Sequence, residues 1–202
     1  MNLTRSISLT ISNCQGEHDY YNCWNHQPAW TFWQKNLGNL QKNWDVPFPV
    51  RTHKFRSEIF AFTCKSTLFI GLHIVRPDSV QNSIEWKAFE KQNQKWLVNQ
   101  VVLFQDKVKA VVLLSHAFPN QEDFPNLWEE FNDVAEFLPH MPFLWLQGDA
   151  LEWTDDDPFR AKNARRVVVD PGGRADPVLV TVDPETSNSR PFFFQRRPLS
   201  QL

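Results

Sequence analysis

The stretch LFIGLHIV, residues 68–75, is apolar on both faces except for His73. Such a pattern is typical of a strand that lies in the centre of a sheet and is covered on both sides. Two more short apolar runs follow it, AVVLL at residues 110–114 and FLWL at residues 143–146, and both predict buried strands. Between them, apolar side chains recur at helical spacing over residues 84–104 and 123–138. The order strand, helix, strand, helix, strand predicts an α/β fold.

The flanking segments extend this predicted domain in both directions. Residues 58–64 are rich in β-forming side chains and are separated from residue 67 by Lys65-Ser66, which predicts a hairpin. No repeat or linker divides the chain, so we expect one domain spanning residues 1–202. The remaining predicted elements are a half-buried strand at residues 6–12, a helix at 27–44, and a C-terminal β meander formed by residues 166–169, 178–182 and 192–194.

Composition limits the classes of partner. Lys and Arg total 21 against 23 Asp and Glu, a formal charge of −2, and no run of Lys and Arg exceeds two residues. Nucleic acids are held largely by Lys and Arg contacts to phosphates, so a nucleic-acid partner is not expected. No stretch approaches the roughly 20 apolar residues that cross a bilayer, and the N-terminal residues lack the continuous apolar segment of a secretory signal. We therefore expect neither a membrane span nor a signal peptide, and no membrane partner.

Polar side chains come directly after two of the buried strands. Ser115-His116 follows the run at residues 110–114, and Gln147-Gly148-Asp149 follows the run at residues 143–146. In open α/β sheets ligands bind at the carboxyl ends of strands, so these residues mark a candidate site.

Other chemically capable side chains favour structural roles. His73, inside an apolar run, is predicted to be a core histidine. The acids at residues 155–157, ahead of Pro158, are typical of a solvated turn rather than of a calcium site. Cys14 and Cys23 can form a disulfide in an oxidising compartment, and the sequence leaves that open.

Short motifs in a fixed order cover nearly the whole chain. They are GEHD at residues 16–19 before Asn22-Cys23, EIFAF at 58–62, LFIG at 68–71, Asn93 with Trp96-Leu97, SHAFP at 115–119, QGDALEW at 147–153 and DDPF at 156–159. Together they resemble one branch of the calcineurin-like metallophosphoesterases, in which the last motif reads His-Gly-Asp-x-His-x-Trp ahead of Asp-x-Pro-Phe.

The resemblance implies an incomplete metallophosphoesterase-type β-sandwich flanked by helices. In the family, two loops, Asp-x-His and Gly-Asp-x-x-Asp, precede the loop that is matched here by residues 16–19. Only 15 residues precede Gly16, and none of them is Asp or His. We therefore expect the N-terminal strands, and the aspartate that bridges the two metal ions, to be missing.

The resemblance also implies which metal ligands remain. His116 matches the family's histidine, although Ser115 replaces the usual glycine before it, and Asp149 matches the branch's aspartate. His18 stands where the family has a metal-binding Asn, and Leu151 replaces the final histidine of its motif. Two imidazoles and a carboxylate can hold one divalent ion such as Mn, Zn or Fe, so His18, His116 and Asp149 form the predicted metal site. The alternative is that no metal binds and that His116 is hydrogen-bonded to a neighbouring backbone group.

These departures predict a degenerate, catalytically impaired metallophosphoesterase, a pseudoenzyme with a truncated domain. One alternative is a residual hydrolase that acts on phosphoesters through a single-metal site. The other is a non-catalytic binding or scaffold module. In that case a second copy or a partner chain would cover the exposed sheet edge, because unpaired strand edges pair readily with other chains.

Overall fold

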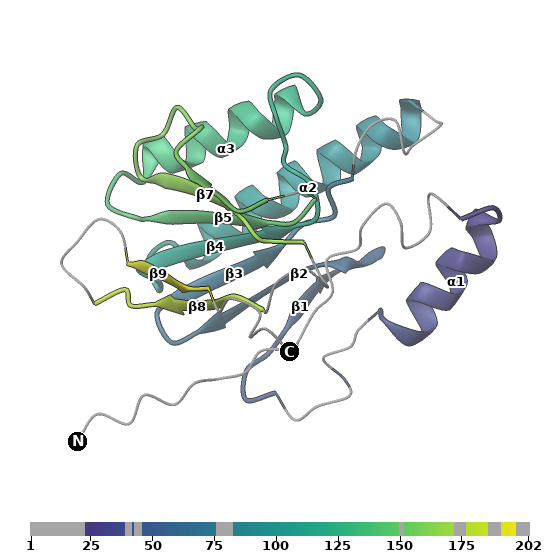
Figure 1. Cartoon of the computed structure of the whole chain (residues 1–202), viewed down its shortest axis with the longest axis horizontal. Helices are drawn as coiled ribbons and strands as arrows, with labels where there is room; N and C mark the ends of the chain where they lie inside the picture. The colour runs from purple at the N-terminus through teal and green to yellow at the C-terminus, as the bar shows by residue number, and fades with distance from the viewer. Residues whose placement is uncertain are drawn as a thin grey trace.

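The computed structural model describes residues 23–38, 42, 46–75, 83–149, 152–171, 177–185 and 191–196. The chain has an α/β fold: a mixed seven-stranded sheet in the order β1-β2-β3-β4-β5-β7-β6, with α2 and α3 on one face and a two-stranded ribbon, β8-β9, on the other (Figure 1). The elements are α1 (His26–Asn36), β1 (Arg51–His53), β2 (Arg56–Cys64), β3 (Thr67–Gly71), α2 (Ser83–Phe104), β4 (Ala110–Ser115), α3 (Pro125–Phe137), β5 (Phe143–Gln147), β6 (Thr154–Asp156), β7 (Ala164–Val168), β8 (Leu179–Val182) and β9 (Phe192–Gln195).

The centre of the large sheet is parallel. Strand β3 pairs with β4, β4 with β5, and β5 with β7, all in parallel, while β1-β2, β2-β3 and β6-β7 are antiparallel. Parallel neighbours need a crossover connection, and α2 and α3 supply the β3-to-β4 and β4-to-β5 crossovers on the same face. The three apolar runs of the sequence are therefore adjacent central strands, as predicted.

The main core lies between this sheet and the two helices. It is rich in aromatic rings that meet edge to face: Phe131 of α3 packs on Trp145 of β5 at a centroid separation of 5.0 Å and on Phe159 at 4.7 Å. Edge-to-face pairs add to the gain from burial itself. On the opposite face, the ribbon β8-β9 covers a smaller cluster that includes Val112, Leu144 and Phe192. Burial on both faces explains why β4 and β5 are continuously apolar.

The hairpin β2-β3 contains a position that admits only glycine. Its turn places Lys65 at a φ of 52°. At the far end, Gly71 lies opposite Phe60, and a Cβ built on Gly71 would stand 2.0 Å from Cε1 of the Phe60 ring. The missing side chain is what lets the ring lie flat across the neighbouring strand.

Two predictions differ from the structure in position or pairing, and a third concerns residues that the structure does not describe. Helix α1 ends at Asn36, not at residue 44, because the N–H groups of Leu37 and Gly38 both donate to the Trp33 carbonyl and close the last turn. The C-terminal meander is wrong: β7 joins the large sheet beside β5, while β8 and β9 pair only with each other in their ribbon. The strand expected at residues 6–12 lies outside the described residues.

The acidic run predicted to be a solvated turn is in part an edge strand. Asp155 and Asp156 belong to β6, and their carboxylates pair with the guanidinium groups of Arg165 and Arg166 on β7. Cross-strand ion pairs of this kind stabilise an exposed edge and use up the carboxylates. The carboxylates of Asp155 and Asp156 are therefore bound by arginine side chains and are not available to a metal ion.

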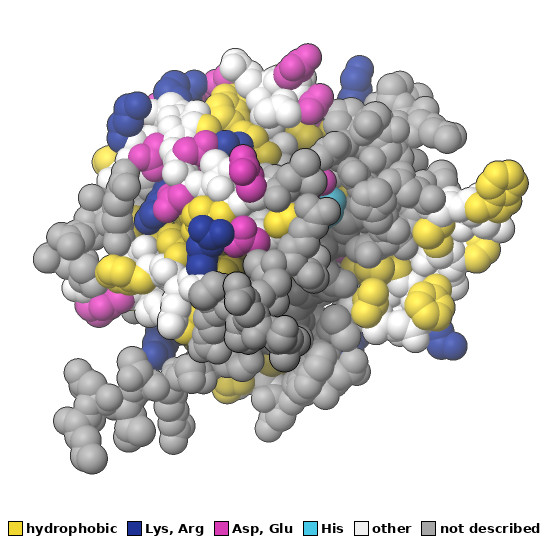
Figure 2. Space-filling view, in the orientation of Figure 1, with side chains coloured by type: hydrophobic (Ala, Val, Ile, Leu, Met, Phe, Trp, Pro, Cys, Tyr) yellow, Lys and Arg dark blue, Asp and Glu magenta, His cyan; other side chains and the backbone are white. Residues whose placement is uncertain are grey.

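Surface side chains show two further features. On the face seen in Figure 2, acidic and basic side chains are interspersed, while apolar side chains stand out on α1. Trp24 and Phe32 beside and on that helix are 104% and 69% exposed. No helix in the described part of the chain combines the length and the apolar character needed to cross a bilayer.

Substituting Gly71 by Ala should destabilise the chain by about 3 kcal/mol, because the new methyl group overlaps the Phe60 ring in a fully packed layer. The matched control is Gly148→Ala, where the nearest atom to a new Cβ is the His116 carbonyl oxygen at 3.9 Å. That change should cost less than about 0.5 kcal/mol. Urea unfolding followed by tryptophan fluorescence measures both, and equal effects at the two glycines would contradict the packing described for the hairpin.

Candidate functional site

His116 and Asp149 lie side by side at the carboxyl ends of β4 and β5. Ser115 and Gln147 are register partners in the parallel ladder, so the residues that follow them leave the sheet at the same edge. Nε2 of His116 is 3.7 Å from Oδ1 of Asp149. That nitrogen is buried and has no hydrogen-bond partner among the described residues. The structure therefore brings together two of the three predicted ligands, while His18 lies outside the described residues.

Local hydrogen bonds hold the loop that carries His116. Ser115 Oγ donates to the Ala117 carbonyl at 2.8 Å, and Trp145 Nε1 donates to the same Oγ at 2.8 Å. The Ala117 N–H in turn donates to the Ile74 carbonyl at 3.1 Å, which ties the loop to the extension of β3. Ser115, which departs from the motif of the family that the sequence resembles, thus has a structural role: its buried hydroxyl links β4 to β5 through Trp145.

Asp149 reaches His116 through an unusual backbone conformation. Its φ is 56°, in the left-handed region that Asp tolerates better than most residues. In this conformation the Asp149 carboxylate lies 3.7 Å from the His116 imidazole.

The two groups lie slightly farther apart than two ligands of one tetrahedral ion. With metal–ligand bonds of about 2.0 to 2.1 Å, two donors 3.7 Å apart subtend an angle of roughly 130° at the metal, so a small approach of the side chains is needed to reach the tetrahedral angle. A third ligand is needed for useful affinity. The described residues contain no group of three or more His, Cys, Asp or Glu side chains placed to hold a metal ion.

Gln147 is a site residue that the motif comparison could have identified and did not. The family motif quoted above has a histidine at this place. Here Gln147 is 6% exposed, its Nε2 donates weakly to the Gly148 carbonyl at 3.4 Å, and its Oε1 has no hydrogen-bond partner among the described residues. An amide oxygen is a poorer ligand than imidazole for transition metals.

His73, at the carboxyl end of β3, belongs to a buried network, in agreement with its predicted role in the core. Its backbone N–H donates to Asn93 Oδ1 at 2.9 Å, and its carbonyl accepts from Asn93 Nδ2 at 2.6 Å. Its ring nitrogen Nδ1 is 3.2 Å from Oε1 of Glu58, which is itself buried. Arg56 donates to the same oxygen at 3.2 Å and lies over the Phe89 ring. These groups stabilise one another, and His73 therefore has a structural role in the core.

The charge on Glu58 depends on this network. Burial alone would raise the pKa of its carboxyl group, but the hydrogen bond and the charge interaction with His73, together with Arg56, outweigh burial. The pKa of Glu58 therefore lies below its ordinary value. A group whose pKa is lowered by folding stabilises the native state above the unfolded pKa, and this contribution disappears as the pH falls through the folded pKa.

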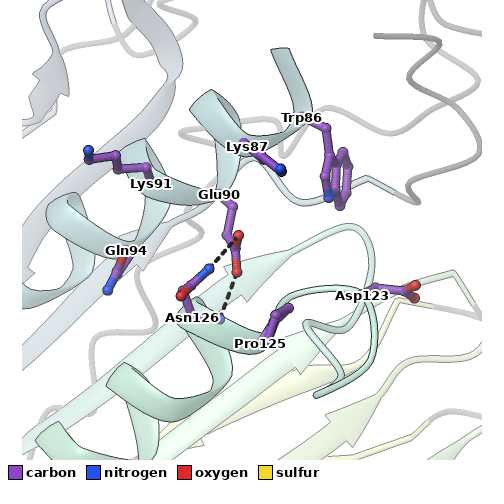
Figure 3. Close-up of a pocket in the computed structure, with 8 residues that line it drawn as sticks. All are labelled: Trp86, Lys87, Glu90, Lys91, Gln94, Asp123, Pro125 and Asn126. Carbon is purple, nitrogen blue, oxygen red and sulfur yellow. Dashed lines mark hydrogen bonds between the residues drawn. The ribbon is translucent and has the colours of Figure 1, made fainter. Parts of the chain in front are cut away.

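A cavity of about 540 Å³ lies elsewhere, between the first turns of α2 and α3 (Figure 3). Its central carboxylate, Glu90, is already bound. Oε1 accepts from the N–H groups of Asn126 and Leu127 at 2.8 and 3.2 Å, and Oε2 accepts from Asn126 Nδ2 at 3.1 Å. Glu90 thus caps α3 from the neighbouring helix, where a negative charge is favoured. This carboxylate is structural, so the strand ends remain the candidate site.

Substituting Glu58 by Gln should lower the free energy of unfolding by about 3 kcal/mol at neutral pH, because a buried ion pair loses one partner. The difference between wild type and variant should shrink as the pH is lowered below the ordinary carboxyl range, about pH 4, because Glu58 then becomes protonated in the wild type too. Urea unfolding over a pH series measures it. The control Glu152→Gln changes an exposed carboxylate and should have no such profile. A difference that stays constant with pH would contradict the role given to Glu58.

Comparisons with known proteins identified no relative of this chain. No family model, no curated protein and no solved structure matches the chain.

Proposed function

We propose that this chain is a metallophosphoesterase-like domain whose two-metal centre is reduced to the pair His116 and Asp149, and that it is catalytically impaired. The observation that carries the proposal is the buried, unpartnered Nε2 of His116, 3.7 Å from the carboxylate of Asp149. Leaving a buried polar atom without a partner costs about 1 to 3 kcal/mol, which a structural histidine would avoid by bonding to the backbone. A bound cation is the partner that both side chains suit.

The position of the pair supports the proposal as well. Both residues follow central parallel strands, where α/β sheets bind their ligands. The order of motifs along the chain supports the proposed family, and the closeness of His116 and Asp149 supports the proposed ligand pair.

The substitutions support the loss of catalysis. Two-metal hydrolysis needs ions about 3.5 to 4 Å apart, each held by several ligands, so that one polarises the phosphoryl group and the other generates hydroxide. Leu151 has no donor atom, and Gln147 offers one neutral amide. The imidazole of His73, which follows β3, is already paired with Glu58. His116 and Asp149 can orient one divalent ion, which would supply Lewis acidity but no second site for the attacking water.

The direct test is isothermal titration of the chain with Mn²⁺. We expect saturable binding with a Kd on the order of 0.1 mM, since few protein ligands contribute. His116→Ala should weaken it at least tenfold, roughly 1.4 kcal/mol. His140→Ala, an exposed histidine beyond α3, is the control and should leave the affinity unchanged. Absence of saturable binding, or equal affinity in the two variants, would rule out the His116–Asp149 site.

A turnover assay tests the proposed loss of catalysis. With Mn²⁺ present, hydrolysis of bis-p-nitrophenyl phosphate should stay near the uncatalysed rate. A chelator-sensitive kcat near the enzyme median of about 10 s⁻¹ would show an active enzyme and contradict the impairment.

Failure of both metal binding and turnover would favour the non-catalytic binding module. The exposed apolar groove between the C-terminal turns of α2 and α3, where Phe137 is 79% exposed, is the surface that favours that second candidate.

A further inference from the structure

Helices α2 and α3 lie side by side on one face of the large sheet, and their outer surface is open to solvent (Figure 1). Two contacts fix how they are aligned. Asn126 Nδ2 donates to Glu90 Oε2 at 3.1 Å, and one turn later Gln94 Nε2 donates to Glu130 Oε2 at 2.9 Å. The partners of both contacts are 36 positions apart. The helices therefore run in the same direction, and each residue of α2 lies level with the residue of α3 that comes 36 positions later.

The C-terminal halves of the two helices expose an apolar patch. A groove of about 310 Å³ runs between their last turns and is lined by Val101, Val102, Gln105, Asp133, Val134, Phe137 and Leu138. Val102 of α2 and Phe137 of α3 are 57% and 79% exposed on the two sides of this groove. Apolar side chains that gather on a solvated surface mark sites of protein association.

Charged side chains lie next to this patch, and their sign differs between the two helices. Helix α2 carries Lys91 and Lys95, which are one turn apart and exposed. Helix α3 carries Glu129 and Asp133, also one turn apart, with carboxylates open to solvent. Arg160 contacts both of these carboxylates and a third one of α3, so three negative charges share one positive charge. The α3 side of the surface therefore remains negative, whereas the α2 side is positive.

This surface is complementary to a second copy of itself. A two-fold axis that runs along the groove, parallel to the helices, places α2 of each copy over α3 of the other at the same level. Lys95 is level with residue 131, so it then lies over the turn of the second copy that carries Glu129 and Asp133. Val102 lies over Phe137 of the second copy in the same way. Because the axis is two-fold, each of these contacts occurs twice.

We propose that the outer face of α2 and α3 is the interface of a symmetric homodimer of this chain. The second copy is the occupant that the charges select, because opposite signs stand at matched levels on two parallel helices and a two-fold axis brings them together. This interface differs from the sheet-edge pairing that the sequence suggested, since no strand takes part in it. The inference goes beyond the proposed function and uses neither His116 nor Asp149.

The size of the face indicates a weak dimer. With a rise of about 1.5 Å per residue, α2 and α3 are about 33 and 20 Å long, and two neighbouring helices are about 20 Å wide. The interface therefore buries on the order of 500 Å² per copy, or 1,000 Å² in total, which is at the low end for a specific interface. We expect a reversible dimer with a Kd on the order of 10 μM.

Sedimentation equilibrium over a concentration series from about 1 to 200 μM measures the dimerisation. Phe137→Ser should weaken it at least tenfold, roughly 1.4 kcal/mol, because the variant lacks the apolar side chain at the centre of the interface. The matched control is Phe55→Ser, in the turn between β1 and β2, where the phenylalanine is 74% exposed. That variant should dimerise like the wild type.

Charge reversal tests which helix faces which. Lys95→Glu and Asp133→Lys should each weaken dimerisation about tenfold, because each brings like charges together across the interface. An equimolar mixture of the two variants should form heterodimers several-fold tighter than either variant forms alone, since each reversed charge then meets its opposite. The control Lys54→Glu reverses an exposed charge beside β1 and should have no effect. Circular dichroism and thermal melting confirm that each variant is folded.

Three results would overturn the inference: a chain that stays monomeric up to about 200 μM, a dimer that Phe137→Ser leaves unchanged, or charge variants that do not associate more tightly when mixed. The two proposals fail separately. A monomer that binds Mn²⁺ removes the dimer and leaves the metal pair, whereas a dimer that binds no Mn²⁺ does the reverse.

Discussion

The parallel pairing of β4 with β5, with Ser115 opposite Gln147, determines where every polar side chain of the site lies. Parallel strands end at the same edge, so His116 and Asp149 leave the sheet together although 33 positions separate them in the sequence. The same pairing requires a crossover, and α3 supplies it while covering the core. The bond from Trp145 to Ser115 joins the two strands just below the point where they diverge. A change in this one register would separate the pair.

Buried polar groups at the described strand ends divide into two classes. Glu58, His73 and Asn93 form a network between β2, β3 and α2 in which each group stabilises another. His116 follows the last residue of β4, and Gln147 is the last residue of β5. The Nε2 atom of His116 and the Oε1 atom of Gln147 are buried and have no hydrogen-bond partner among the described residues. Buried polar atoms without partners call for a physical explanation. Trp33 Nε1, Glu58 Oε2 and Gln100 Oε1 are further such atoms among the described residues. What motivates the proposed ligand site is therefore the position of the His116 nitrogen, 3.7 Å from the Asp149 carboxylate.

The sequence predicted the central sheet well because burial on both faces leaves an unmistakable pattern in β3, β4 and β5. It also placed His116 and Asp149 at strand ends. It failed for β6, since Asp155 and Asp156 lie in a strand only because Arg165 and Arg166 stand opposite, and for the ribbon β8-β9, whose pairing depends on which face it covers. The roles of Glu90 as a cap for α3 and of Gln147 as an unpartnered acceptor depend on contacts with distant or facing residues, which no local pattern records.

The proposed metal-binding pair, His116 and Asp149, lies at the ends of β4 and β5. Paramagnetic broadening of backbone amide NMR signals by substoichiometric Mn²⁺ tests it most directly, because the effect falls steeply with distance from the ion. We predict broadening centred on residues 115–118 and 147–149, with the signals of β6 unaffected. Broadening centred on the acids at residues 155–157, or spread evenly over exposed carboxylates, would contradict the account.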